Sequence, residues 1–176
     1  MRGWIRGVAM ALAVATVAAC HVEPPDPNAP RELTKDVSVS GQITVANVKA
    51  LRDKGFKTIV NMRPDSDAPD QAKYPQLQSA AQDAGLGYGY IPLKKGAAIP
   101  STAAEALGSV LSRMPKPILL FEETPDRPAK VWALAEASRA GGLDADAIMK
   151  AVKSAGLSAD DLATQINARI AARPKH

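Results

Sequence analysis

The most informative segment of this sequence is Pro117-Ile118-Leu119-Leu120-Phe121-Glu122-Glu123-Thr124-Pro125-Asp126-Arg127. Its four consecutive apolar residues, bounded by a proline and a pair of glutamates, predict a short buried strand. The polar residues that follow predict a loop, and a helix is expected to begin beyond them. In α/β proteins, ligands bind where the carboxyl end of a strand runs into the N-terminus of a helix. Residues 122–127 therefore stand at the position of an active site.

The segments on either side of this strand alternate between strand and helix patterns. Residues 37–40, 57–62 and 86–91 have the composition of strands, with turn residues at their ends. Helical patterns lie between them, at 45–54 with Val45 on the apolar face, at 75–84, and after the expected cap Ser101 as far as residue 113. Further helices follow at 129–140 and after the expected caps Asp144 and Ser158. This alternation predicts an α/β fold with a central, mostly parallel sheet of four to five strands flanked by helices.

Length, charge and the count of reactive residues restrict the possible functions. The 176 residues are sufficient for one domain, and the net charge is +4. Arg2 and Arg6 contribute two of these charges from a leader, so the remaining chain is nearly balanced and a nucleic-acid partner is not expected. The single cysteine, Cys20, excludes an internal disulfide, and the two histidines lie near the ends of the mature chain, at His21 and His176. We therefore expect no metal, no cofactor and no histidine-based catalytic triad.

The N-terminus has the pattern of a bacterial export signal. Basic residues within 1–6 precede a short apolar run at 7–16, which is too short for a comfortable transmembrane helix. Val17-Ala18-Ala19-Cys20 resembles a bacterial lipobox, which implies removal of a signal peptide, 1–19, and lipidation of Cys20. The expected partner is then the membrane, and His21 after the cysteine favours the periplasmic face of the outer membrane. The alternative is an ordinary signal peptide with an incidental cysteine.

A proline-rich tether is predicted to separate the lipid from the folded domain. Residues 20–32 contain four prolines and few apolar groups, which disfavours helix and packing. A proline-rich ligand for a partner is the alternative reading. The domain is expected to cover residues 33–176, and its last two helices are expected to cover one side of the sheet. These helices could instead form a partner surface.

Three blocks of the sequence resemble a known family. They are similar to blocks of small bacterial phosphatase-like domains. The first block is 37–44, the second is 51–65, which ends in Asn61-x-Arg63-Pro64-Asp65, and the third consists of 84–88 and 91–93. Such domains occur alone or fused to β-lactamase-like hydrolases, and the resemblance extends from about residue 33 to about residue 142. It implies the fold of dual-specificity tyrosine phosphatases.

The resemblance also identifies what residues 122–127 would do in an active relative. In that family the loop carries a Cys-x5-Arg motif. Its thiolate attacks phosphorus, its backbone N–H groups hold the phosphate oxygens, and its arginine clamps them. Here the cysteine position is Glu122, and the arginine position is Arg127, which matches.

The loop therefore keeps one of the two catalytic hallmarks. Glu122 cannot replace a thiolate, and Cys20 is the lipidation candidate. Glu123 and Asp126 place negative charge where a phosphate dianion would bind. The remaining loop residues are Thr124 and Pro125, of which the proline lacks a backbone donor. These departures predict a pseudophosphatase with a binding or scaffolding role, in which no residue is assigned as catalytic.

Several alternatives remain open for the charged residues near this loop. Asp65 is a possible general acid or a turn residue after Pro64, and Lys95 falls where related phosphatases often hold an acid. The candidate ligand-binding residues are Arg127, Arg63 and Asn61. The arginines could instead neutralise Glu122, Glu123 or Asp65 in a structural ion cluster, or the acids could meet a new, cationic ligand.

Two other functions compete with the pseudophosphatase. A hydrolase of altered chemistry could use Glu122 and Glu123, with Asp126 or Asp65, as an acid/base pair or as ligands of Mg²⁺ or Ca²⁺. This hypothesis requires a raised carboxylate pKa in an open cleft. The third possibility is a purely structural lipoprotein of the bacterial cell envelope.

Overall fold

The computed structural model describes Asp26 and residues 28–174. The predicted signal peptide, the lipidation candidate Cys20 and most of the predicted tether lie outside the described residues. Among the helices that are described, none is long and apolar enough to cross a membrane.

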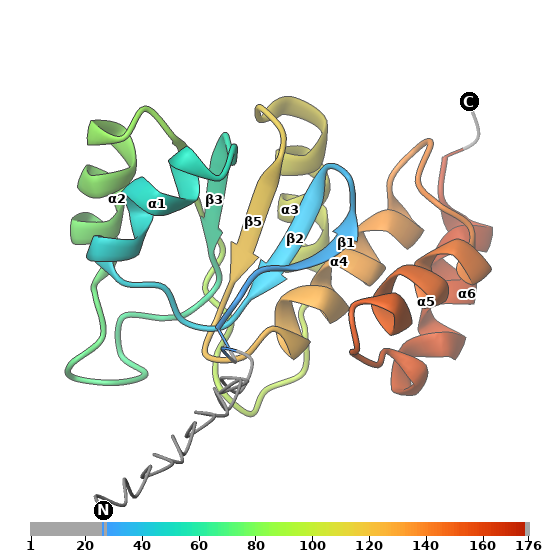
Figure 1. Cartoon of the computed structure of the whole chain (residues 1–176). Coiled ribbons are helices and arrows are strands. Elements are labelled where there is room, and N and C mark those ends of the chain that lie inside the picture. Colours follow the sequence, from blue (N-terminus) through green and yellow to red (C-terminus); the bar gives the residue numbers. More distant parts are fainter. Residues whose placement is uncertain (1–25, 27, 175–176) are drawn as a thin grey trace, which may run out of the picture.

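A five-stranded sheet forms the centre of the domain (Figure 1). Its strands are β1 (Arg31–Thr34), β2 (Val37–Ser40), β3 (Thr58–Asn61), β4 (Gly87–Tyr90) and β5 (Ile118–Phe121), in the order β1-β2-β5-β3-β4. β1 is antiparallel to β2, and every other pair is parallel, which confirms the predicted fold class. The loops that follow the parallel strands consequently meet at one edge of the sheet, here called the carboxyl edge, opposite the amino edge.

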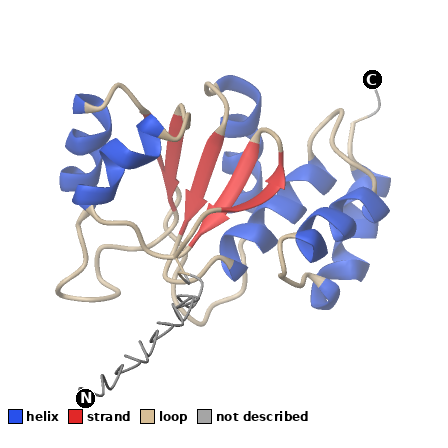
Figure 2. Cartoon of the chain, in the orientation of Figure 1, coloured by secondary structure: helices blue, strands red, loops and turns tan. Residues whose placement is uncertain are grey.

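Helices cover both faces of the sheet (Figure 2). One face packs against α1 (Val45–Asp53) and α2 (Tyr74–Asp83). The other packs against α3 (Ser101–Arg113) and α4 (Asp126–Ser138). The chain ends with α5 (Ala145–Ser154), a short 3₁₀ helix η1 (Asp160–Leu162) and α6 (Ala163–Ala172).

The apolar run 118–121 forms the central strand. β5 lies between β2 and β3, and all four of its residues are buried. Ile118 and Leu120 face α3 and α4, whereas Leu119 and Phe121 face α1 and α2, as the two-residue period of a strand requires. Phe121 is in register with the last residues of both neighbours. The loop that begins at residue 122 therefore starts between the ends of two parallel strands.

The strand β1 was not predicted. Arg31 and Glu32, which the sequence pattern assigns to the tether, pair with β2 at Val39 and Ser38. β1 is an edge strand with one buried residue, Leu33, so its four residues carry almost no hydrophobic signal.

Two predicted helix starts were wrong. Ser101 is the first residue of α3 rather than its cap, because Pro100 holds the capping position. α4 begins at Asp126 instead of residue 129. Pro128 lies in its first turn, where the missing N–H of a proline costs no helical hydrogen bond.

Two side chains also differ from their predicted roles. Val45, expected on the buried face of α1, is 45% exposed because it is the first residue of the helix. Ser158 accepts a hydrogen bond from the Asp160 amide at 3.2 Å, but the turn that it begins is η1, and the regular helix starts only at Ala163. The cap at Asp144 is confirmed, since its carboxylate accepts from the Ala147 amide at 2.8 Å.

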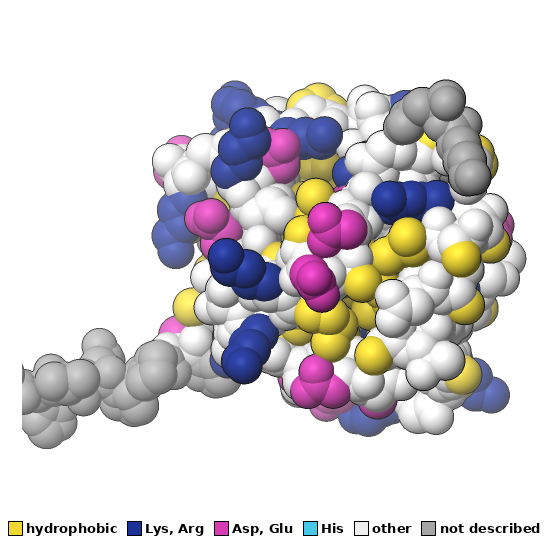
Figure 3. Space-filling view, turned by 90° about the vertical axis from the view of Figure 1, so that its right-hand side faces the viewer, with side chains coloured by type: hydrophobic (Ala, Val, Ile, Leu, Met, Phe, Trp, Pro, Cys, Tyr) yellow, Lys and Arg dark blue, Asp and Glu magenta, His cyan; other side chains and the backbone are white. Residues whose placement is uncertain are grey.

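The sequence suggested that the last two helices cover one side of the sheet, but only α5 touches the sheet, at its edge strand, and α6 does not pack on it. α6 packs on α4, and α5 packs on α4 and on the edge strand β1. Ile148, Val152 and Ile166 are the buried side chains of this unit. Figure 3 shows this end of the molecule, where apolar side chains are visible between charged ones. The helical pair thus extends the α3–α4 layer.

Candidate functional site: a self-paired loop at the carboxyl edge

The loop 122–125 lies at the carboxyl edge, where the loops after β2, β3 and β4 also gather (Figure 1). Glu122 follows the central strand directly, and Arg127 lies in the first turn of α4. The strand-loop-helix geometry expected from the sequence is therefore present. It brings the predicted residues Glu122, Glu123, Arg127 and Arg63 into one cluster, which we call the loop cluster.

Glu122 points into the protein rather than towards solvent. Its side chain is only 5% exposed. One carboxylate oxygen lies 3.3 Å from Nη1 of Arg127, and the other accepts a hydrogen bond from the Glu123 amide at 2.7 Å. A backbone N–H of the loop and the arginine are the two kinds of donor that hold an anion in such a loop. Here both are directed at a carboxylate of the chain itself.

Arg127 has further partners in the loop that follows β4. Its Nη2 donates to the carbonyl oxygens of Lys94 and Ala97 at 3.1 and 3.2 Å, and its Nη1 reaches that of Leu93 at 3.4 Å. The guanidinium thus joins the β4–α3 loop to the β5–α4 loop. This role depends on backbone atoms and needs no ligand.

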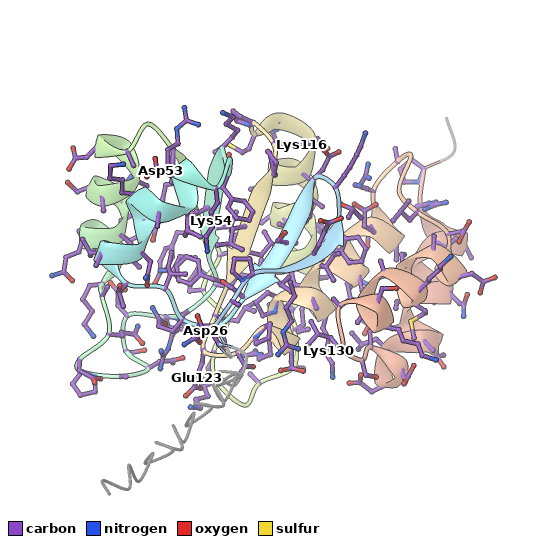
Figure 4. All side chains as sticks on the ribbon, viewed as in Figure 1. Asp26, Asp53, Lys54, Lys116, Glu123 and Lys130 are labelled. Carbon is purple, nitrogen blue, oxygen red and sulfur yellow. The ribbon has the colours of Figure 1, made fainter. Side chains whose placement is uncertain are left out.

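A second ion pair lies at the surface of the cluster. Lys95 Nζ is 2.6 Å from a carboxylate oxygen of Glu123, which Figure 4 labels at the carboxyl edge. The hydrogen bond from Lys95 lowers the pKa of Glu123, with a smaller contribution from the charge of Arg63. A general acid requires a raised pKa, so the geometry of Glu123 disfavours the acid/base hypothesis.

Arg63, in the β3–α2 loop, connects the loop cluster to the β2–α1 loop. Its Nη1 donates to the side-chain oxygen of Gln42 at 2.8 Å, and its Nη2 lies 3.9 Å from Glu123. Its Nε is 3.8 Å from Asp67. Asn61, at the end of β3, accepts from the Arg63 amide at 2.8 Å and donates to the hydroxyl of Tyr88 at 3.2 Å. Asn61 therefore fixes the backbone that positions Arg63.

Asp65 is bound to α2 rather than to the loop cluster. Its carboxylate accepts from the amide of Tyr74, the first residue of α2, at 2.7 Å. Its carbonyl oxygen accepts from Nζ of Lys73 at 2.8 Å. These bonds agree with the turn interpretation and give Asp65 a role in fixing the loop between β3 and α2.

Some residues of the site were missed from the sequence. Gln42 contacts Arg63 from the β2–α1 loop, whose proximity only the sheet order reveals. Asp67 lies near Arg63 in the same β3–α2 loop. Tyr88 is partly buried against Asn61, and burial raises its pKa to about 12. The sequence could have indicated a role for Pro128. A proline in the first turn of α4 removes one more N–H from the helix end that would face an anion.

Metal ligands do not gather in the described part of the chain. Residues 26 and 28–174 contain no group of three or more His, Cys, Asp or Glu side chains arranged to hold an ion. Glu122 and Glu123, which the altered-hydrolase hypothesis offers as ligands, are instead paired with Arg127 and Lys95.

Residues 30–140 match the model of the phosphatase-like domain of β-lactamase hydrolase-like proteins. The chain belongs to this family. The resemblance predicted from the sequence is confirmed, and the matched range includes β1 and ends after α4.

Curated relatives of this phosphatase-like domain are longer proteins. The chain is 30% identical over 105 residues to a β-lactamase hydrolase-like protein of Agrobacterium fabrum, and 26% identical over 105 residues to one of Xylella fastidiosa. Each alignment covers 60% of this chain but only 24% of the relative. The chain thus corresponds to about a quarter of the length of these relatives.

Solved structures show that the phosphatase-like fold is shared. A candidate phosphatase of Neisseria meningitidis superposes with a TM-score of 0.66 at 22% identity, covering 79% of this chain and 96% of that protein. A kinase-associated phosphatase with a substituted catalytic cysteine superposes with a TM-score of 0.65 at 11% identity, covering 86% and 100%. At these identities the likeness establishes the fold, which agrees with the predicted dual-specificity-phosphatase-like architecture.

Proposed function

We propose that this chain is a catalytically inactive member of the phosphatase-like family, with a binding or scaffolding role in the bacterial cell envelope. The observation that carries the proposal is the position of Glu122. Its buried carboxylate takes the hydrogen bonds of the Glu123 amide and of Arg127. A carboxylate at this position supplies no thiolate, and the family mechanism has no first step without one.

The contacts of the loop cluster disfavour phosphate binding as well as phosphate cleavage. A phosphate dianion in the loop would have to displace Glu122 from Arg127 and open the contacts of Arg127 to the β4–α3 loop. It would also meet the carboxylates of Glu122 and Glu123. Each like charge at about 4 Å costs roughly 1 kcal/mol in water, and more in a partly buried loop. The loop cluster is therefore better described as an internal ion network than as an anion site.

The proposed membrane anchor is compatible with the course of the chain. Asp26, the first described residue, lies at the carboxyl edge near Glu123 (Figure 4). Six residues lead from Cys20 to Asp26, and such a segment spans at most about 20 Å. Lipidation of Cys20 would hold the loop cluster close to the periplasmic face of the outer membrane, where the binding partner would be another envelope component.

Hydrolysis of an aryl phosphate tests the proposal. The full-length protein is assayed together with its Arg127→Ala, Glu122→Cys and Glu122→Cys/Arg127→Ala variants. We expect no turnover by the natural protein. Any activity that Glu122→Cys gains should disappear in the double variant, because the arginine is needed to hold the phosphate. Turnover by the natural protein that Arg127→Ala abolishes would refute the proposal.

Binding of inorganic phosphate separates loss of chemistry from loss of the site. Titration calorimetry should detect no phosphate binding to the natural protein and weak binding to Glu122→Ala, in which Arg127 and the Glu123 amide are released. Equal binding by both proteins would show that Glu122 does not occupy the anion position.

A further inference from the structure

We propose that the amino edge of the sheet is a docking surface for an acidic segment of another protein. Four exposed cationic side chains gather there: Lys35, Lys57, Arg113 and Lys116. We call this set the basic edge. It lies at the opposite end of the sheet from the loop cluster, and nothing in the proposed loss of phosphatase activity requires it.

The sheet places these side chains next to one another. Lys35 lies in the turn before β2, Lys116 lies before β5 and Lys57 lies before β3, and these strands are consecutive in the sheet. The backbone ladder continues into this region, because the Ile118 amide bonds to the Asp36 carbonyl oxygen and the Lys57 amide to that of Pro117, each at 2.9 Å. Neighbouring strands are about 4.8 Å apart. The three lysines therefore form a row across the end of the sheet.

Arg113, the fourth cation of the basic edge, and Arg139, which is not part of it, flank the row on the α3–α4 side. Arg113 is at the end of α3, and Arg139 follows α4. A hollow of about 200 Å³ lies between Lys35, Lys116 and Arg139. Figure 3 shows Lys and Arg side chains along the upper part of the molecule, the end at which Figure 4 places Lys116.

The charge of the basic edge is not neutralised internally. Within the described part of the chain, no carboxylate lies within ion-pair distance of its four side chains, whereas Lys49, Lys95 and Lys130 each have one. Asp36 lies in the same turn as Lys35 and leaves three net positive charges. Arg139 adds no net charge to this region, because Glu136 forms an ion pair with it at 2.7 Å. A surface of this kind attracts an anionic partner over about 10 Å in dilute salt.

An acidic polypeptide fits this surface better than a lipid bilayer does. Apolar side chains beside the cations strengthen the binding of a shallow surface to a bilayer, because they insert between the lipid headgroups. The large hydrophobic side chain that is most exposed in the described chain, Val45, begins α1 at the carboxyl edge. If Cys20 is lipidated as proposed above, the tether also enters at the carboxyl edge, and the basic edge then points away from the anchoring membrane.

Poly-L-glutamate and phosphatidylglycerol vesicles are suitable probes for the full-length protein held in detergent-free nanodiscs of neutral lipid, which occupy the proposed anchor at Cys20. The test variant is Lys57→Glu/Lys116→Glu. The matched control is Lys150→Glu/Lys153→Glu, which changes two exposed lysines of α5 and alters the net charge equally. Unfolding midpoints of both variants establish that they are folded. We expect the test variant to bind poly-L-glutamate about tenfold more weakly and the control to bind it nearly as well as the natural protein.

Two results would overturn the proposal. An equal loss of affinity in both variants would show a dependence on net charge and no local surface. Binding of the natural protein to the vesicles that the test variant loses, with no binding to poly-L-glutamate, would identify a membrane surface instead. Phosphatase turnover by the natural protein would refute the proposed function and leave this result standing, so the two failures are distinguishable.

Discussion

Replacing Arg127 by methionine should destabilise the domain more than replacing Glu122 by glutamine, although the two side chains share one ion pair. The reason is an asymmetry in their other partners. Arg127→Met leaves the carboxylate of Glu122 buried, with only the Glu123 amide as its donor. Glu122→Gln leaves Arg127 with three carbonyl acceptors and a side chain that is 22% exposed to water.

The structure sets the expected magnitudes. Leaving one member of a buried pair without its partner costs about 3–5 kcal/mol. The contacts of Arg127 are long, between 3.1 and 3.4 Å, which favours the lower end of this range. We expect about 3 kcal/mol for Arg127→Met and about 1 kcal/mol for Glu122→Gln, since the amide still accepts from the Glu123 N–H. In a domain of this size these losses lower the Tm by about 9 °C and about 3 °C.

Urea unfolding followed by circular dichroism measures both losses. The decisive variant is Arg127→Met/Glu122→Gln. It buries no unpaired charge and should be about 1 kcal/mol more stable than Arg127→Met alone, so a second mutation restores part of the stability. A double variant whose loss equals the sum of the single losses would refute the pairing. A larger loss for Glu122→Gln than for Arg127→Met would refute the asymmetry.

Three further predictions concern titration and packing. Tyr88 should ionise with a pKa of about 12 in an ultraviolet absorbance titration, and the Tyr88→Phe variant should lack this phase. Because the pKa of Tyr88 is raised in the folded protein, the free energy of unfolding should be unaffected by Tyr88 below about pH 10 and should fall as the pH rises towards 12. Lys95→Met should raise the pKa of Glu123 towards its ordinary value in an NMR titration, and no change would contradict the pairing. Gly142→Ala should lower the free energy of unfolding by more than about 2 kcal/mol, because the added Cβ would collide with the carbonyl oxygen of Glu136. In the control Gly108→Ala, in α3, the added Cβ meets nothing closer than 3.8 Å, and the free energy of unfolding should rise by about 0.5–1 kcal/mol. Equal unfolding midpoints for the two glycine variants would contradict the packing around Gly142.

The α/β architecture was predictable because its central strands carry strong local signals. The fully buried run 118–121 and the alternation of strands with helices determine a mostly parallel sheet. The edge strand β1 has a single buried residue, so four residues of sequence could not distinguish it from the preceding tether. The turn after β1, which places Lys35 at the amino edge, could not be predicted for the same reason.

The position of the candidate site was predictable from the sequence, but the ion pairs and hydrogen bonds within it were only partly predictable. The ion cluster around Arg127 and Arg63 was one of the open alternatives, and the contacts of Glu122 and Glu123 agree with it. The assignment of Gln42 to Arg63 depends on the sheet order, in which β2 and β3 both neighbour β5. Sequence separation gives no information about that proximity. The carbonyl acceptors of Arg127 carry no side-chain signal at all.

These carbonyl contacts give Arg127 a structural role in a loop whose cysteine position holds Glu122. Three of the four acceptors of Arg127 are backbone oxygens, which any sequence in the β4–α3 loop would supply. The planar guanidinium reaches them from two nitrogens at once, and the single ammonium of a lysine could not. The arginine of the Cys-x5-Arg motif therefore has a structural use that is independent of catalysis. Its presence alone therefore does not indicate phosphatase activity, and the Glu122→Cys assay proposed above tests the cysteine position directly.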